Sequence, residues 1–340
     1  AIFLDPILRA FGASDQSLPY AREFMLWVIP GLVLINLTFN LNNVMRASGY
    51  PQKAMFFMLT SVAINCTLNP LFIFVFGWGI RGAALATILA QCTTLVWQTR
   101  LLSNPNELLH LQRGIYKLKS SIVKGILSIG MSPFLINAAA CMVVIIINKG
   151  LRSNSDNGDL SIAAYGISNR MQFIFVMIVL GLTQGMQPIV GYNYGAKRTD
   201  RVKKVLTLTI LWATLVTTVG FVVCEFIPDL VARIFTTDSA LIEKASWAMR
   251  VMSVFMPVIG FQLVTTNFFQ SIGKVNRSIF LSLTRQVLML IPLLLVLPLY
   301  LGENGVWYSM PISDIVAAML TVVMLILQFR EWKREKTNNI

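Results

Sequence analysis

Nine long apolar runs dominate this sequence and limit what it can fold into. They cover residues 22–46, 53–77, 81–102, 120–149, 160–190, 202–226, 243–271, 276–300 and 305–330. Each run reaches the roughly 20 residues with which a helix crosses the hydrocarbon core of a bilayer. Only helices and closed barrels satisfy their backbone hydrogen bonds in lipid, and continuous runs of this length favour helices. We therefore predict an all-α membrane protein with nine spans in a lipid bilayer.

The charge distribution indicates how the chain is oriented in the membrane. Charged residues make up only 13% of the chain, whereas about a quarter of the residues of a soluble protein are charged. The net charge of +13 would suit nucleic-acid binding, but 18 of the 28 Lys and Arg residues fall in alternate loop segments. These are 46–53, 100–124, 197–204, 274–277 and 330–336. The positive-inside rule makes these segments cytoplasmic. We predict a multi-pass protein of the plasma (inner) membrane with a cytoplasmic C-terminus and no nucleic-acid partner.

Parts of the sequence repeat at a nearly fixed offset. The motif Asp-x3-Arg-x-Phe occurs twice, and a polar loop and an apolar segment that closes on a glycine follow each copy. The positions are Asp5, Arg9, Phe11 and Gly49, and, 224 residues later, Asp229, Arg233, Phe235 and Gly273. Residues 79–82 return as 302–305 at an offset of 223. Two same-sense copies of a multi-helix unit are typical of transporters whose substrate path lies between the copies.

The two copies are unequally complete, and this predicts the domain organisation. In the second copy, three apolar runs that begin near Ser120 precede the motif, whereas almost nothing precedes the motif in the first copy. We expect a fragment of a twelve-helix, two-lobed bundle that lacks roughly its first two and a half helices. The predicted parts are an incomplete N-lobe (1–102), a cytoplasmic linker (103–119), a C-lobe (120–330) and a cytoplasmic tail (331–340). We expect a monomer.

Polar residues inside the apolar runs are the candidate functional residues, because each is costly unless it is paired or faces water. Asn65 and Asn69 lie one helical turn apart just before Pro70, and Thr87 follows on the next run. Their oxygens suit a partly dehydrated Na⁺ or a protonated carboxyl group. Further candidates to line a cavity are Asn36, Asn40, Asn137, Gln184, Gln187, Gln262 and Asn267. Hydrogen bonding between helices is the alternative interpretation for the asparagines of the first half, Asn36, Asn40, Asn65 and Asn69.

Asp314 is the only carboxylate that we place deep in the membrane. A lone charge there is expensive, so Arg285 on the preceding run is its expected partner. A structural ion pair and a role in handling protons or substrate are both open interpretations.

Nothing in the sequence indicates an enzyme. It contains no nucleophile elbow, ATP-binding loop, paired carboxylates or metal-spaced His and Cys residues. We predict no cofactor. A pump without an ATP-binding motif uses an ion gradient or a separate ATPase, and Na⁺ or H⁺ would be the coupling ion.

Several motifs resemble those of the multidrug and toxic compound extrusion (MATE) transporters. The similar stretches are 181–197 (GLTQGMQPIVGYNYGAK), 11–14 with 20–23, 46–51, 65–74 and 82–87. The resemblance covers the chain from the family's third helix to its twelfth. It implies that cytoplasmic organic cations or other small amphiphiles are expelled in exchange for Na⁺ or H⁺ by rocking of two lobes.

The resemblance also assigns residues. Asn65 and Thr87 match the first-lobe cation site of one branch of the family, and Asn69 stands where that branch has an aspartate. The acids that another branch uses in its second lobe have no counterpart here. The resemblance thus implies that the essential carboxylate lies in the absent N-terminal segment. The alternative is a lipid-linked precursor flippase of related fold, which needs a cavity rich in Arg and Lys. Arg170 and Arg285 are the only basic residues that we place within spans.

Overall fold

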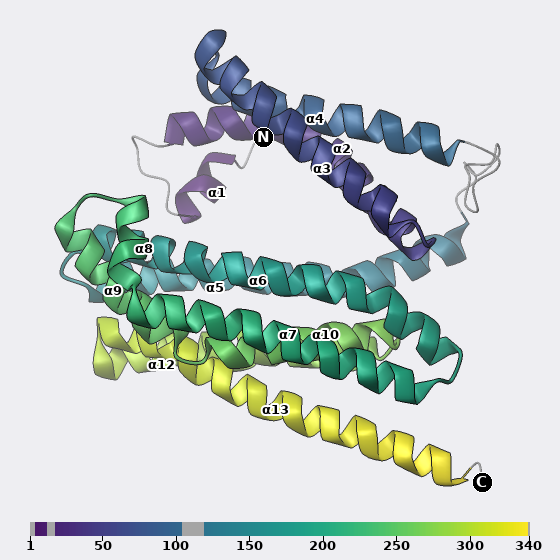
Figure 1. Cartoon of the computed structure of the whole chain (residues 1–340). Coiled ribbons are helices and arrows are strands. Elements are labelled where there is room, and N and C mark those ends of the chain that lie inside the picture. The colour runs from purple at the N-terminus through teal and green to yellow at the C-terminus, as the bar shows by residue number, and fades with distance from the viewer. Residues whose placement is uncertain (1–3, 12–17, 104–118, 339–340) are drawn as a thin grey trace. The chain divides into compact units, whose positions relative to one another are not determined.

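A computed structural model describes residues 4–11, 18–103 and 119–338, and every regular element in that part of the chain is a helix (Figure 1). The first elements are α1 (Leu4–Ala10), α2 (Leu18–Ala47), α3 (Pro51–Pro70), the π-helix η1 (Leu71–Val75) and α4 (Gly79–Leu102). They are followed by α5 (Ser120–Asn154), α6 (Gly158–Gly195), α7 (Thr199–Phe226), α8 (Pro228–Phe235), α9 (Ser239–Ser253), α10 (Met256–Ser271), α11 (Val275–Leu283), the π-helix η2 (Thr284–Leu290), α12 (Ile291–Leu301) and α13 (Glu303–Asn338). The predicted all-α fold is confirmed.

The chain divides into two compact units, Ala1–Gly125 (unit 1) and Ile126–Ile340 (unit 2). Residues 104–118 of the predicted linker lie outside the described residues. The predicted tail begins at residue 331, but α13 continues to Asn338 as helix. The side chain of Trp332 in this extension is buried. The last turns of α13 therefore belong partly to the packed body of unit 2.

Seven helices in the described part of the chain are long and apolar enough to cross a membrane. They are Leu18–Arg46, Pro51–Val75, Gly79–Leu102, Gly158–Gly195, Thr199–Phe226, Val275–Leu301 and Glu303–Arg334. The pair α9 and α10 is an eighth candidate span, bent by 52° at its junction. The ninth predicted span, 120–149, forms part of helix α5, but several of its side chains lie outside the described residues. That span stays a prediction.

The bent span corrects two expectations. We expected one continuous run over 243–271, but α9 ends at Ser253 and α10 begins at Met256. Pro257 lies in the first turn of α10, where a missing N–H is tolerated, and it cannot donate the backbone bond that would continue α9. The bent span also carries Lys244 and Arg250, so Arg170 and Arg285 are not the only basic residues within spans.

The repeated glycines have similar positive φ angles in both copies. Gly49 and Gly273 have φ angles of 87° and 75°, and Gly79 and Gly302 have φ angles of 55° and 57°. A side chain at such a φ angle is strained, whereas glycine adopts it freely. The fixed offset in the sequence therefore reflects two turns that both copies build in the same way.

The end of α3 is shaped by Pro70, which has no N–H with which to continue the regular helical ladder. The helix widens there into the π-helix η1. The next helix, α4, approaches η1 closely at Gly82, where an added Cβ would lie 2.8 Å from the carbonyl oxygen of Phe72. This approach holds the Asn69 end of α3 against the first turns of α4.

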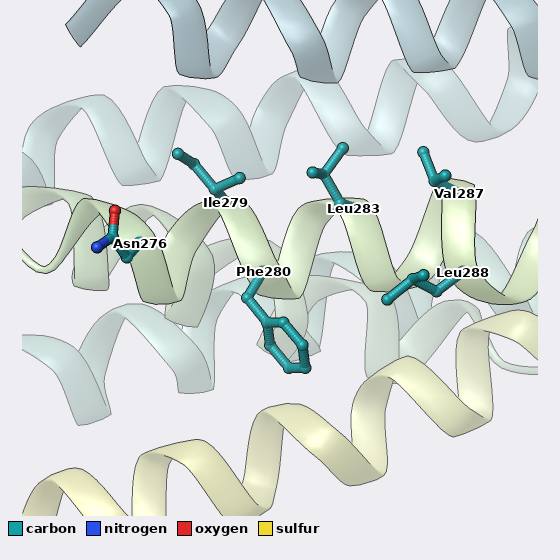
Figure 2. Close-up of a pocket in the computed structure, with 6 residues that line it drawn as sticks. All are labelled: Asn276, Ile279, Phe280, Leu283, Val287 and Leu288. Carbon is teal, nitrogen blue, oxygen red and sulfur yellow. The ribbon is translucent and has the colours of Figure 1, made fainter. Parts of the chain in front are cut away.

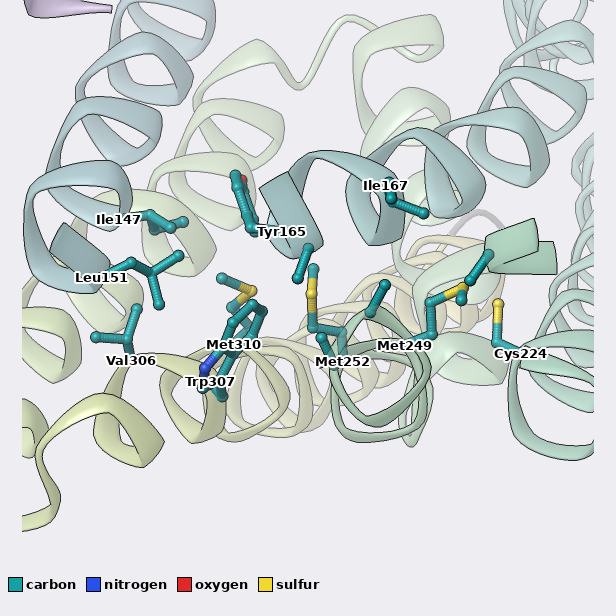
Figure 3. Packing of buried hydrophobic residues seen from close by; sticks show 14 of the residues in the cluster. Ile147, Leu151, Tyr165, Ile167, Cys224, Met249, Met252, Val306, Trp307 and Met310 are labelled. Atoms are coloured by element: carbon teal, nitrogen blue, oxygen red, sulfur yellow. The ribbon is translucent and has the colours of Figure 1, made fainter. Parts of the chain in front are cut away.

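A hydrophobic core occupies the end of unit 2 where α13 begins (Figure 3). Its centre is Trp307, which is fully buried. The Trp307 ring lies 5.9 Å from that of Trp247 in a perpendicular arrangement and 6.5 Å from that of Tyr165. These contacts join α6, α9 and α13. Such aromatic pairs stabilise a fold by about 0.5–1.5 kcal/mol beyond the area that they bury.

A second core in unit 2 involves the other end of α13. Trp332 packs against Phe268 and Tyr194, with ring centres 6.0 Å and 6.2 Å apart. Beside it the carboxylate of Glu331 pairs with Arg277 and, at 2.6 Å, with Lys274. Both ends of α13 are thus fixed to their neighbours, and its central part carries Asp314.

Candidate functional site

The three residues predicted to handle the coupling ion meet in unit 1. The Asn69 Nδ2 group donates to Asn65 Oδ1 at 2.7 Å, and Asn65 Nδ2 donates to the Thr87 hydroxyl oxygen at 3.1 Å. The Thr87 hydroxyl in turn donates to the carbonyl oxygen of Ala83 at 3.0 Å. We call Asn69, Asn65 and Thr87 the amide chain. It crosses from α3 to α4, and all three side chains are half-buried.

All the hydrogen bonds of the amide chain run the same way, from Asn69 toward Ala83, and the oxygen at the Asn69 end has no donor. Each of its three members donates toward the next, ending at Ala83. This leaves Asn69 Oδ1 as an acceptor, and that atom is buried without a hydrogen-bond partner. An unsatisfied buried polar atom costs about 1–3 kcal/mol. A donor or a cation placed beside Asn69 would remove that cost.

Asn36 and Asn40 do not join the amide chain. Their side chains are exposed on α2 and donate to backbone carbonyls of their own helix, those of Leu32 and Asn36, each at 2.8 Å. Local bonds of this kind leave each amide oxygen available on the surface of the helix.

Asn42 is buried, although it was not among the residues predicted to be functional. Its Nδ2 group donates to the Ala54 carbonyl oxygen at 2.8 Å, and its Oδ1 accepts from Arg46 Nε at 2.9 Å. The available signal was its position four residues before Arg46. Asn42 fixes α2 against α3.

Two of the candidates on the long helices of unit 2 bond to each other across a helix contact. Gln187 Nε2 on α6 donates to Asn267 Oδ1 on α10 at 3.2 Å. Gln262 on α10 is buried, and its Oε1 atom has no partner. Asn137 lies exposed on α5 and Gln184 half-buried on α6. The bond between Gln187 and Asn267 therefore joins α6 to α10 through two of the predicted cavity residues.

Arg285 and Asp314 lie together within unit 2. The Nε atom of Arg285 is 2.6 Å from Asp314 Oδ1. The side chain of Asp314 is 6% exposed and that of Arg285 29% exposed, so the guanidinium is the accessible partner. Arg285 lies in the π-helix η2, and short π-helical segments are frequent at functional sites. Its neighbour Gln286 has a buried Oε1 atom without a partner.

Glu303 is a further carboxylate in unit 2, half-buried, that no sequence motif indicated. Its Oε1 atom accepts from Lys244 Nζ and Ser161 Oγ, each at 2.8 Å, and from Trp307 Nε1 at 3.0 Å. These donors come from α9, α6 and α13, so one carboxylate joins three helices beside the Trp307 core. The only sequence signal was the spacing of four residues between Glu303 and Trp307.

Unit 2 also carries an apolar groove of about 330 Å³ along α11 and η2 (Figure 2). It is lined by Asn276, Ile279, Phe280, Leu283, Val287 and Leu288. Figure 2 shows Ile279, Leu283 and Val287 projecting to the same side of the helix. The lining is apolar apart from the Asn276 amide.

Comparisons with known proteins agree with the motifs. The MatE family model matches residues 1–71 and 130–296. The multidrug export protein MepA of Staphylococcus aureus strain N315 is 27% identical over 326 residues, covering 95% of this chain and 71% of MepA. An outward-facing multidrug resistance MATE family transporter matches the fold with a TM-score of 0.87 at 23% identity, covering 97% of this chain and 75% of that one. A MOP superfamily transporter from Pyrococcus furiosus has the same TM-score at 22% identity, covering 97% and 74%.

The matched residues include α3 with Asn65 and Asn69, and also α6, α10 and η2. These comparisons favour the drug-exporter interpretation over the flippase. The family model spans more than half of the chain, and the solved structures share its all-helical architecture. The chain therefore belongs to the MatE family of transporters, as its sequence motifs predicted.

Proposed function

We propose that the protein is a secondary active antiporter that expels small organic cations and other amphiphiles from the cytoplasm in exchange for Na⁺ or H⁺. Membership of the MatE family and similarity to MepA, a multidrug export protein, support this proposal. The export cycle is alternating access in the plasma membrane, with a cytoplasmic C-terminus. The sequence has no ATP-binding motif, and we propose an ion gradient rather than a separate ATPase as the source of energy.

The amide chain is the proposed coupling site, and the unpartnered Asn69 Oδ1 carries this assignment. Three neutral side chains aligned from α3 to α4 present one free acceptor at their beginning. A proton donor that arrives there gains a hydrogen bond without breaking an existing contact, and a cation gains its first oxygen ligand. Its departure restores the unsatisfied atom, so occupancy changes the stability of the contact between α3 and α4.

H⁺ and Na⁺ would require different rearrangements of the amide chain. A protonated carboxyl group needs only Asn69 Oδ1, because one O–H donor satisfies that acceptor. Na⁺ requires several oxygen ligands, so Asn65 Oδ1 and Thr87 Oγ1 would have to turn away from their present donors. A Na⁺-coupled cycle therefore breaks the bond between Asn69 and Asn65, and an H⁺-coupled cycle leaves it intact.

The test is dye efflux by the full-length protein reconstituted in vesicles. A Na⁺ gradient alone and a pH gradient alone are imposed in separate experiments, and the gradient that drives export of a cationic dye identifies the ion. We expect Asn69→Leu to slow gradient-driven export about tenfold, since a hydrogen bond or ligand to a charged group contributes about 1.5–3 kcal/mol.

Thr67→Val is the matched control. Thr67 lies between Asn65 and Asn69 on α3 but is exposed and donates only to its own helix, to the Ala63 carbonyl oxygen at 2.9 Å. Its replacement should leave export unchanged. Equal export by the wild type and Asn69→Leu would remove the amide chain from the coupling site. Export that responds to neither gradient would contradict antiport itself.

A further inference from the structure

Arg170 is an arginine within the long helix α6 that has neither a hydrogen bond nor an ion pair in the part of the chain that the structure describes. Its side chain is exposed. By contrast, Arg285 pairs with Asp314, and Lys244 pairs with Glu303. The question is what compensates the charge of Arg170 within a membrane-spanning helix.

The rotation of α6 directs Arg170 away from the core of unit 2. Ser161 and Val179 lie nine residues before and after Arg170, which places them on the opposite side of the helix. Both are fully buried. On the Arg170 side, Phe173 and Ile174 are 53% and 51% exposed. One turn before Arg170, Ile167 is buried, so the guanidinium lies where an uncovered apolar stretch of the helix begins.

Arg170 is also far from the ends of its helix. The nearest charged residue before it on α6 is Asp159, eleven residues or about 16 Å away along the helix axis. After it α6 contains no further charged residue, and the next one in the sequence is Lys197. An unpaired guanidinium at this depth is costly in lipid, so the helix face that carries it must meet water or an anion.

Arg250 is the informative comparison, because it too is exposed and has no partner in the described part of the chain. It follows Lys244 by six residues on α9, about 9 Å of helix. A long side chain can extend toward such a charged turn and reach the aqueous surface. Arg170 has no charged turn within that reach.

We propose that Arg170 receives the carboxylate or other anionic group of a zwitterionic amphiphile, whose apolar part lies against Phe173 and Ile174. A guanidinium binds a carboxylate through two parallel N–H···O bonds, and all the N–H donors of Arg170 are available for this. The inference rests on the proposed export function and names a substrate class for it. It adds an anion-binding residue to a path otherwise expected to take cations.

The test uses two probes that differ only in this group: rhodamine B, which has a free carboxylate, and its ethyl ester, which has none. Export of each is measured with the full-length protein in vesicles. We expect Arg170→Gln to slow rhodamine B export about tenfold, from the loss of a charged hydrogen-bond pair. The ester should change by less than about twofold, because it makes no ion pair with the guanidinium.

Two further variants complete the design. Arg233→Gln changes an exposed arginine on the short helix α8 and should alter neither probe. Arg170→Lys keeps the charge without the planar fork, and we expect a severalfold loss for rhodamine B alone. It also serves if Arg170→Gln does not reach the membrane.

The outcomes separate this inference from the proposed function. A wild-type protein that exports the ester but not rhodamine B would overturn the role of Arg170 and leave the export proposal standing. Equal losses for both probes in the Arg170 variants would also overturn it, since they would indicate a general structural role. Export of neither probe by the wild type would contradict both proposals.

Discussion

The sequence repeat relates two helical hairpins, α3–η1–α4 in unit 1 and α11–η2–α12–α13 in unit 2. The two hairpins have similar backbone features but different polar side chains. Each contains a π-helical segment and a glycine that lets the next helix approach closely. These glycines are Gly82, where an added Cβ would lie 2.8 Å from the Phe72 carbonyl oxygen, and Gly305, where it would lie 2.5 Å from that of Leu297. In unit 1 the polar residues are neutral and form the amide chain. In unit 2 they are the charged pair Arg285 and Asp314.

The polar positions of the two hairpins do not coincide. Through offsets of 224 and 223, Arg285 corresponds to Ser61 and Asp314 to Gln91, four residues from Asn65 and Thr87. Four residues are about one helical turn. Arg285 and Asp314 neutralise each other's charge, whereas the amide chain leaves the acceptor Asn69 Oδ1 without a hydrogen bond. The hairpin of unit 2 thus holds a complete ion pair, and the related hairpin of unit 1 holds a hydrogen-bond acceptor that can still bind a donor or a cation.

Breaking the charged pair should have the largest effect. Asp314→Asn and Arg285→Gln each leave one charge without its partner, and removing one member of a buried pair costs about 3–5 kcal/mol. Thermal unfolding in detergent should show both single variants strongly destabilised. The double variant separates the two interpretations of the pair. Recovery of both stability and dye export would make it structural, and recovered stability without export would give it a role in transport.

Replacing the close-contact glycines by alanine tests whether the two hairpins depend equally on tight helix packing. Gly82→Ala and Gly305→Ala each place a Cβ against a backbone carbonyl that cannot move aside, and overpacking costs about 1–3 kcal/mol. We expect similar losses of unfolding free energy in the two units. Gly166→Ala on α6 is the control, because nothing lies within 4 Å of its added Cβ. A loss confined to one hairpin would show that the repeat is not conserved in its packing.

The bond across the hairpin of unit 1 should contribute less. Thr87→Val removes the acceptor of Asn65 Nδ2 and should cost about 1 kcal/mol, the net contribution of one hydrogen bond. Thr93→Val on the same helix is matched to it, because the Thr93 hydroxyl is exposed and donates only to the Leu89 carbonyl oxygen at 2.9 Å. Equal stability of the two variants would argue against a contribution from the bond between α3 and α4.

Asn69→Leu should have the smallest effect on stability. The change removes the unsatisfied Asn69 Oδ1 but also the bond to Asn65 Oδ1, and the two contributions oppose each other. We expect a change within about 1 kcal/mol in thermal unfolding, because an unsatisfied group and a lost hydrogen bond are similar in size. Slower export at unchanged stability would locate the effect of Asn69 in function. A large destabilisation would instead make Asn69 a structural residue.

The candidate site was predictable only in part. Asn65, Asn69 and Thr87 stood out because polar residues in apolar runs are few, and the spacing of four residues placed two of them on one helix face. The same reasoning selected Asn36 and Asn40, which bond only to their own helix, and passed over the buried Asn42. Glu303 was also overlooked, because it lies at the edge of an apolar run.

The sequence by itself determined the helical class, most of the candidate spans and the turns that the repeat builds with glycine. These depend on local chemistry: lipid requires each backbone to satisfy its own hydrogen bonds, and a positive φ angle favours glycine. Only the tertiary structure decided which amides meet, which atom of Asn69 stays free, and that Glu303 joins three helices. Those outcomes depend on the rotation and depth of each helix against its neighbours, and residues far apart in the sequence set that packing together.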